Sequence, residues 1–187
     1  MRIKVGIMGS ADDAITEGSG NTLRKTAEEL GRSIARKDAL LMTGATTGVI
    51  RIAGLAARAA GVFHIGISPA SSINKHIAEY DLPIDACEAI VYTGFGLKGR
   101  NVVLVRSCDI VLFIAGSIGS LNEFTIAYDE GKIIGCLLGT GGVADEAANL
   151  VKVLGKPTKS KIFYDEDPDR LLDKCFAALE TSGVKAK

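Results

Sequence analysis

The stretch from Asp109 to Glu123 reads D-I-V-L-F-I-A-G-S-I-G-S-L-N-E and is the part of the sequence that most clearly indicates the fold class. Its first half, Ile110 to Ala115, is an unbroken apolar run of strand length, which is typical of a parallel strand buried on both faces. Glycines at positions 116 and 119 then indicate a tight turn, and Ser120 is placed to open a helix. A buried strand that turns directly into a helix is the repeating unit of an open parallel α/β sheet.

The same unit recurs from one end of the chain to the other. Apolar runs predict strands at Ile3–Met8, Leu40–Thr43, Val62–Ile67, Ala89–Tyr92, Asp109–Ile114, Ile133–Leu138 and Lys161–Tyr164. Helical spacing predicts helices at Thr22–Arg36, Val49–Ala60, Asn101–Cys108, Ser120–Glu130 and Asp145–Leu154, and a last helix that Asp167-Pro168 opens. Right-handed crossovers between such units give a doubly wound, Rossmann-like α/β fold with a parallel sheet of about seven strands.

The length of 187 residues matches one domain, so we expect a single Rossmann-like domain over residues 1–187. Two segments look irregular, Gly9–Gly20 and Ser68–Glu88, and the second is long enough for a short helix around Ile77. The tail after about residue 180 is expected to fray.

Glycine gathers where a ligand of such a sheet would bind. The chain has 22 glycines in 187 residues, about 12% against a usual ~7%. They follow the carboxyl ends of five predicted strands, at Gly9, Gly44, Gly48, Gly94, Gly96, Gly99, Gly116, Gly119, Gly139, Gly141 and Gly142. Ligands bind beyond this edge, and glycine lets backbone amides approach an anion. Tight turns also need glycine, so a purely structural role is the alternative.

The familiar nucleotide-binding fingerprints are missing. No GxGxxG follows the first predicted strand, and no GxxxxGK[ST] occurs in the chain. A standard dinucleotide-binding domain and a P-loop kinase are therefore not favoured.

The loop from Gly116 to Ser120 allows two interpretations. Free amides of the first helical turn, with the hydroxyls of Ser117 and Ser120, could cradle a phosphate. Alternatively, Ser120 to Glu123 forms an S-x-x-E capping box, in which Glu123 bonds back to the start of the helix and no ligand is needed.

Two cations, Lys98 and Arg100, lie upstream where another helix begins. Cations at a helix N-terminus oppose its dipole, and a bound anion nearby would offset that cost. The alternative is that both side chains are solvated on the surface.

Composition excludes several classes of protein. Basic and acidic residues number 22 each, so no charge excess points to nucleic acid or an anionic membrane as a partner. Aromatic residues make up only 5%, which argues against base-stacking proteins. No apolar run approaches membrane-span length and no signal peptide is evident, so we expect a cytoplasmic protein whose four cysteines are reduced and mostly buried.

The chain resembles the Lonely Guy (LOG)-like superfamily of Rossmann proteins, long mislabelled as lysine decarboxylases. The signature of that superfamily, PGGxGTxxE, aligns with Ala115 to Glu123, and the arginine of the preceding helix aligns with Arg100. The stretch from Thr93 to Asn101, T-G-F-G-L-K-G-R-N, looks closest to a branch that includes molybdenum-cofactor carrier proteins. The similarity spans about residues 3 to 180.

The resemblance implies binding of a phosphorylated, nucleotide-like ligand and hydrolysis of the N-glycosidic bond of a nucleoside 5′-monophosphate. Arg100 and Glu123 would then be catalytic, without metal or cofactor. The phosphate-binding residues would be Gly116, Ser117, Gly119 and Ser120, and further ligand contacts would come from Gly9, Ser10, Thr43, Gly44, Gly48, Thr93 and Gly94. The alternative is a non-enzymatic carrier or sensor for molybdenum cofactor or a nucleotide. The superfamily also implies a homodimer or larger homo-oligomer.

Several residues depart from the superfamily pattern. Ala115 replaces its Pro, Ser117 replaces a Gly, and Ser120 replaces its Thr but keeps the hydroxyl. Gly44-Ala45-Thr46-Thr47 replaces a GGG stretch, and Ile50-Arg51 replaces the Met-Glu of many relatives. These changes bear on the ribose and base contacts and on turnover.

Overall fold

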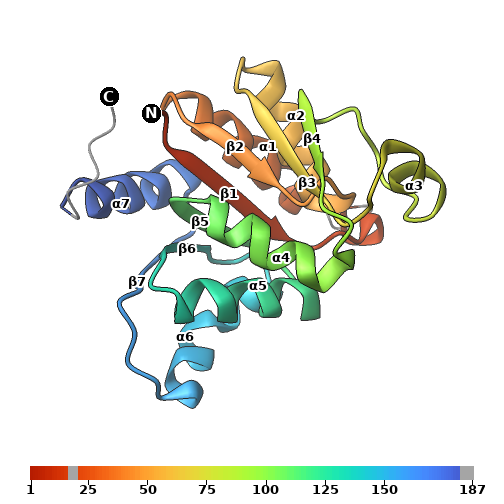
Figure 1. The fold of residues 1–187 in the computed structure, drawn as a ribbon. Coiled ribbons are helices and arrows are strands. Elements are labelled where there is room, and N and C mark those ends of the chain that lie inside the picture. The colour runs from red at the N-terminus through yellow and green to blue at the C-terminus, as the bar shows by residue number, and fades with distance from the viewer. Residues whose placement is uncertain (17–20, 182–187) are drawn as a thin grey trace.

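A computed structural model describes residues 1–16 and 21–181, and all seven of its strands belong to one parallel sheet (Figure 1). The strand order is β4-β3-β2-β1-β5-β6-β7. The strands are β1 (Lys4–Gly9), β2 (Leu40–Thr43), β3 (His64–Ser68), β4 (Ala89–Tyr92), β5 (Ile110–Ile114), β6 (Ile133–Leu137) and β7 (Lys161–Asp165). The predicted seven-stranded, doubly wound parallel sheet is confirmed.

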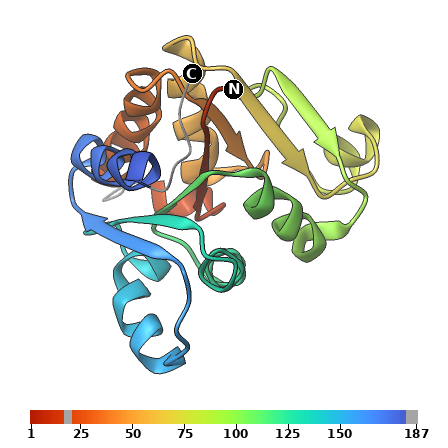
Figure 2. The same ribbon diagram turned by 60° about the vertical axis from the view of Figure 1, so that its left-hand side comes forward.

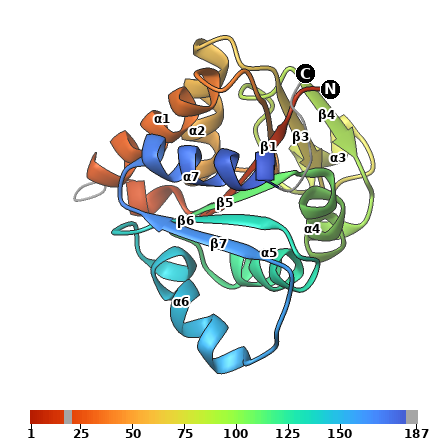
Figure 3. The same cartoon turned by 90° about the vertical axis from the view of Figure 1, so that its left-hand side faces the viewer.

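Helices cover both faces of the sheet, as Figures 1 and 3 show. One face carries α1 (Asn21–Ala35), α2 (Gly48–Ala59) and α7 (Pro168–Thr181). The other carries α4 (Gly96–Ser107), α5 (Ile118–Asp129) and α6 (Gly142–Leu154). A single turn, η1 (Asp13–Thr16), follows β1, and α3 (Ile73–Ala78) lies outside the sheet beyond β4, as Figure 2 also shows.

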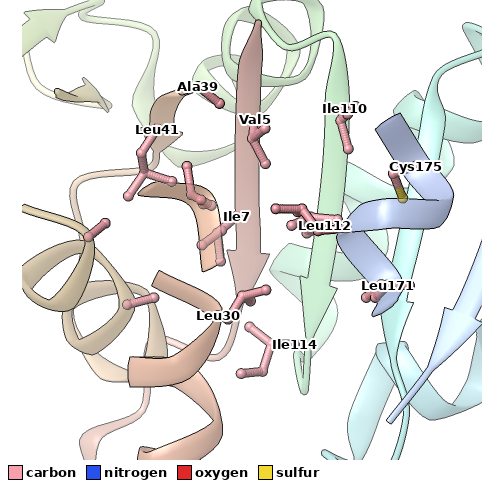
Figure 4. Packing of buried hydrophobic residues seen from close by; sticks show 14 of the residues in the cluster. Val5, Ile7, Leu30, Ala39, Leu41, Ile110, Leu112, Ile114, Leu171 and Cys175 are labelled. Carbon is pink, nitrogen blue, oxygen red and sulfur yellow. The ribbon is translucent and has the colours of Figure 1, made fainter. Parts of the chain in front are cut away.

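The two cores lie on opposite faces of β5, which is fully buried. Ile110, Leu112 and Ile114 point into the core beneath α1, α2 and α7, where Leu30 and Leu171 pack nearby (Figure 4). Val111 and Phe113 point into the other core, which α4, α5 and α6 cover. This two-sided burial explains why the strand lacks polar alternation.

The crossovers change face between β1 and β5. The chain leaves β1 towards α1 on one face and leaves β5 towards α5 on the other, although β1 and β5 are neighbours. The helices therefore diverge at the carboxyl ends of these two strands, the place where open α/β sheets bind ligands.

Several predicted boundaries are wrong by a few residues. Helix α5 begins at Ile118 rather than Ser120, α4 begins at Gly96 rather than Asn101, and α6 begins at Gly142 rather than Asp145. Helices α4 and α6 begin at a glycine with a positive φ, 67° at Gly96 and 58° at Gly142, and α5 begins two residues after Gly116, whose φ is 105°.

Other local predictions are confirmed. Helix α7 opens at Pro168, and the Asp167 carboxylate accepts a hydrogen bond from Arg170 N at 2.9 Å. The four cysteines are free thiols, with Cys87 partly and the other three fully buried. The Ser68–Glu88 segment contains α3, as expected. The later part of Gly9–Gly20 and the tail beyond Thr181 lie outside the described residues. Among the described helices, none is both long and apolar enough to cross a bilayer.

Candidate functional site

A pocket of about 380 Å³ opens beyond the carboxyl ends of β1, β5 and β6. Its lining comes from the loops that follow these strands and from α1, and consists of Ser10, Asp12, Leu23, Ala115, Gly116, Ser117, Thr140 and Gly142. Three of the predicted site residues thus line the same pocket, which lies at the point where the crossovers change face. They are Ser10, Gly116 and Ser117.

The N-terminus of α5 faces this edge with unused amides. Ser117 is the N-cap, and its side chain makes no capping hydrogen bond. Leu121 N donates to Ser117 O at 2.9 Å, whereas the amides of residues 118–120 donate to no acceptor in the described chain. Such a terminus carries partial positive charge and can bind an anion.

The starts of α2 and α6, at the same edge of the sheet, have amides already bonded within the protein. In α2, Gly48 N donates to Asp13 Oδ1 at 2.8 Å and Val49 N to Ser10 O at 3.1 Å. In α6, Val143 N donates to Gly116 O at 3.0 Å, and the next amide donates to the carbonyl of residue 115. Of these three helix starts, only that of α5 leaves its first three amides without an acceptor in the described part of the chain.

The capping-box interpretation of Ser120 is wrong. Ser120 lies in the third position of α5 rather than at its N-cap, and its Oγ donates to Gly9 O at 3.0 Å. That bond ties the end of β1 to α5. Glu123 therefore has no N-cap partner three residues before it and turns towards α4 instead.

The turn before α5 has a backbone that differs from the superfamily pattern. Ala115 has a φ of 52°, which proline cannot adopt, so the replacement of proline goes with a different turn. Gly116 has a φ of 105°, and a Cβ there would stand 2.7 Å from the Ser120 side chain. Ser117 has an ordinary extended φ of −122°, so glycine is not required at that position.

Arg100 and Glu123 meet as a buried pair. Arg100 Nη1 lies 3.4 Å from Glu123 Oε1, and each side chain is only 8% exposed. The solvated-surface interpretation of Arg100 is therefore wrong. Arg100 Nε is buried and has no hydrogen-bond partner among the described residues. A buried donor without a partner is costly, so this nitrogen is a natural place for a ligand oxygen.

Glycine at position 44 makes room for this pair. A Cβ on Gly44 would stand 2.0 Å from Arg100 Nη1 and 2.6 Å from Cζ. The guanidinium thus lies directly against the backbone at the end of β2. Gly44, predicted as a ligand contact, therefore acts on the site by leaving room for the Arg100 side chain.

Burial controls the electrostatics of the pair. Burial raises the pKa of Glu123 to about 7, although Arg100 and, less strongly, Lys98 oppose that rise. Burial also lowers the pKa of Arg100, and Glu123 counteracts part of that effect. Near neutral pH, the carboxyl group can therefore exchange a proton while the guanidinium stays charged.

Lys98 adds an exposed cation to the start of α5. Its Nζ would lie 3.9 Å from a Cβ placed on Gly119, and no carboxylate of the described chain pairs with it. The ammonium and the free α5 amides form one electropositive surface.

The remaining predicted ligand residues serve internal contacts. Thr43 is fully buried and its Oγ1 lies 2.8 Å from His64 Nε2. Thr93 Oγ1 donates to Ser68 O at 2.7 Å, and Gly94 follows with a φ of 69°. Gly9 and Gly48 allow close packing, since a Cβ on either would stand 2.4 Å from a backbone oxygen.

Sequence reasoning missed four residues at this site, whereas it had already singled out Lys98 as a cation near a bound anion. Thr140 lies inside a glycine cluster that the sequence singled out, so that cluster could have led to it. Asn101 directly follows Arg100 and could have been found in the same way. Asp12 and Leu23 come from a loop and a helix without a comparable signal.

Similar proteins share this architecture. An uncharacterized protein from Archaeoglobus fulgidus is 29% identical over 113 residues, which cover 60% of this chain and 69% of that protein. The X-ray structure of TM1055 has a TM-score of 0.77 and 27% identity, covering 92% of this chain and 99% of the other. The molybdenum cofactor binding protein from Rippkaea orientalis has a TM-score of 0.74 and 23% identity, covering 98% and 99%.

The match that carries the classification spans almost the whole chain. Residues 2–172 match the family model LDcluster4, and this range contains every described strand, helices α1 to α6 in full, the start of α7, and the Arg100–Glu123 pair. With the seven-stranded fold and the glycine loop before α5, this match shows that the chain belongs to the SLOG cluster4 family.

Proposed function

We propose that the chain binds a phosphorylated, nucleotide-like ligand and hydrolyses the N-glycosidic bond of a nucleoside 5′-monophosphate. The observation that carries the proposal is the buried Arg100–Glu123 pair beside the free amides of α5. The phosphate would rest on those amides and beside Lys98, while Arg100 Nε would donate to a ligand oxygen.

In this proposal Glu123 serves the reaction as a carboxylate. Water adds through its oxygen to C1′ of the ribose while the C1′–N bond breaks, and the base leaves with a proton. The transition state resembles an oxocarbenium ion, which a nearby carboxylate stabilises. With a pKa of about 7, Glu123 can take the proton of the attacking water near neutral pH and then release it to the departing base, so that the proton lost by water is the one that the base gains.

Incubation with a panel of nucleoside 5′-monophosphates tests the proposal. Free base and ribose 5-phosphate should appear in equal amounts, and Glu123→Gln should slow their release about 100-fold or more, because electrostatic stabilisation is lost. Equal turnover by both proteins would remove Glu123 from the reaction.

A specific observation favours a second candidate, a non-enzymatic carrier or sensor for molybdenum cofactor or a nucleotide. The loop after β2 is bonded to the loop after β1, with Thr47 Oγ1 donating to Ala11 O at 2.5 Å and the amides of Gly48 and Val49 donating to Asp13 Oδ1 and Ser10 O, so its polar groups are already used within the protein. The fold is also that of a molybdenum cofactor binding protein. Binding without product release from any nucleotide would support this candidate.

We also keep three expectations as proposals: residues 1–187 form one domain, the protein is cytoplasmic, and it assembles as a homodimer or larger homo-oligomer. Light scattering of the purified chain measures the assembly directly.

A further inference from the structure

The two carboxylate oxygens of Glu123 have different surroundings. Oε1 lies 3.4 Å from Arg100 Nη1. Oε2 accepts no hydrogen bond from the described chain. A carboxylate with one oxygen held and the other open has a defined reactive side, provided that something fixes its rotation.

Asn101 supplies a second contact to the held oxygen. Its side chain is on α4 and only 3% of the residue is exposed. With the amide turned so that Nδ2 faces these oxygens, Nδ2 donates to Glu123 Oε1 and to Leu97 O, both at 3.1 Å. The opposite orientation would turn Oδ1 towards both of these acceptors and leave Nδ2 donating to Asn122 Oδ1 at 2.8 Å as its one bond.

The Asn101 amide is itself held on two further sides. Leu97 O, one turn earlier on α4, accepts from Nδ2, and the Asn122 side-chain amide, turned in the same way, donates its Nδ2 to Asn101 Oδ1 across 2.8 Å. Asn122 directly precedes Glu123 on α5, so the contact also ties the two helices together. Because the Asn101 amide contacts Leu97 and Asn122 as well as Glu123, it has little freedom to move with the carboxylate. The amide therefore fixes the rotation of the Glu123 carboxylate.

We propose that Asn101 is a positioning residue, which holds Glu123 Oε1 through Nδ2 and leaves Oε2 as the oxygen that acts on a bound ligand. The inference rests on the proposed function for the role of Oε2, but the contact can be tested in the ligand-free protein.

The charged and titratable groups around Glu123 are few. Arg100 and Lys98, both on α4, act on it electrostatically. Cys108, directly after the end of α4, also interacts electrostatically with Glu123. Burial raises the pKa of the Cys108 thiol to about 12, so the thiol stays neutral. A change in the titration of Glu123 on mutation of Asn101 is therefore attributable to the lost hydrogen bond.

The test measures the pH titration of the Glu123 side-chain carboxyl carbon by NMR, without ligand, in wild type and Asn101→Leu. The variant keeps the side-chain size and loses the donor to the ionised carboxylate, so the midpoint should rise by about one pH unit or more. Thr125→Val, which removes a hydroxyl that bonds Asn122 O rather than Glu123, should leave the midpoint unchanged.

An unchanged midpoint in a folded Asn101→Leu protein would overturn the inference. If that variant does not fold, Asn101→Ser removes the amide with less bulk and should give the same rise. With a nucleotide that wild type turns over, Asn101→Leu should lower kcat about 10-fold or more with little change in KM. Absence of turnover in wild type would count against the proposed function, and the ligand-free titration would still decide the role of Asn101.

Discussion

The guanidinium of Arg100 lies against Gly44, so close that a Cβ on residue 44 would stand 2.0 Å from Nη1. Arg100 comes from α4 and Gly44 from the end of β2, 56 positions earlier in the chain. The backbone at the end of β2 thereby limits where the guanidinium of Arg100, which comes from α4, can lie.

Gly44→Ala should displace Arg100 and slow turnover of nucleoside monophosphate about 100-fold, because a misplacement of about 1 Å can cost that much. Crowding should also lower the free energy of unfolding by about 1–3 kcal/mol. Gly6→Ala is the matched control, since its Cβ would stand 2.5 Å from Cys108 Sγ, away from the site. A similar loss of turnover in both variants would show that general destabilisation, rather than Arg100, is responsible.

Glu123→Gln should become more stable relative to wild type as the pH rises. Glu123 has an ordinary pKa of 4.5 and a folded pKa of about 7, so wild type loses stability as pH rises between these values. From pH 6 to pH 8 that loss is about 1 kcal/mol, and the variant lacks it. Urea unfolding at both pH values measures the difference. An identical pH dependence in the two proteins would contradict the burial of an ionisable Glu123.

The buried His64 should make the free energy of unfolding fall as the pH decreases, opposite to the effect of Glu123. Burial lowers its pKa below the ordinary 6.5, so the unfolded chain takes up a proton that the folded chain resists, and stability falls as pH drops below about 6.5. The slope contributed by His64 can reach about 1.4 kcal/mol per pH unit. Urea unfolding in the Glu123→Gln background isolates this effect, and the added His64→Gln substitution should flatten the curve. A curve that stays equally steep would assign the acid sensitivity to other groups.

Lys98→Ala should weaken binding of AMP about 3- to 10-fold, as expected for one exposed cation. Its folding should not change, because the side chain is exposed and unpaired in the described chain. The difference from wild type should shrink in 0.5 M salt, which screens exposed charges. Lys152→Ala, exposed on α6, serves as the control. Equal weakening by both variants would indicate a general charge effect.

Much of the fold could be predicted because the apolar runs are so regular. Ile110 to Ile114 are fully buried on both faces of the sheet. A continuous apolar run of this length is typical of a parallel strand covered by helices on both sides, so it could be recognised from the sequence. Helix starts were harder, since Ser120 and Asp145 look like N-caps in the sequence. In the structure, Asp145 instead accepts from Gly139 N and Gly141 N within the preceding turn, and Ser120 bonds Gly9 O.

The sequence predicted which residues gather near the site better than it predicted the contacts that each of them makes. Arg100 and Glu123 come together as the resemblance implied, 3.4 Å apart. Thr43 and Thr93 could not be recognised as internal, because their partners His64 and Ser68 are distant in sequence. The role of Asn101 depends on the approach of α4 to α5, which no local pattern describes.

The amides at the start of α5 are proposed to hold the phosphate of the ligand. Titration of the ¹⁵N-labelled protein with AMP and with ribose 5-phosphate, followed by amide NMR spectra, measures this contact. Both ligands should shift the amides of residues 117–120 in a saturable way, while the amides that open α2 and α6, already bonded within the protein, should move little. Saturable shifts elsewhere with none at residues 117–120, or no shift with either ligand, would contradict the account.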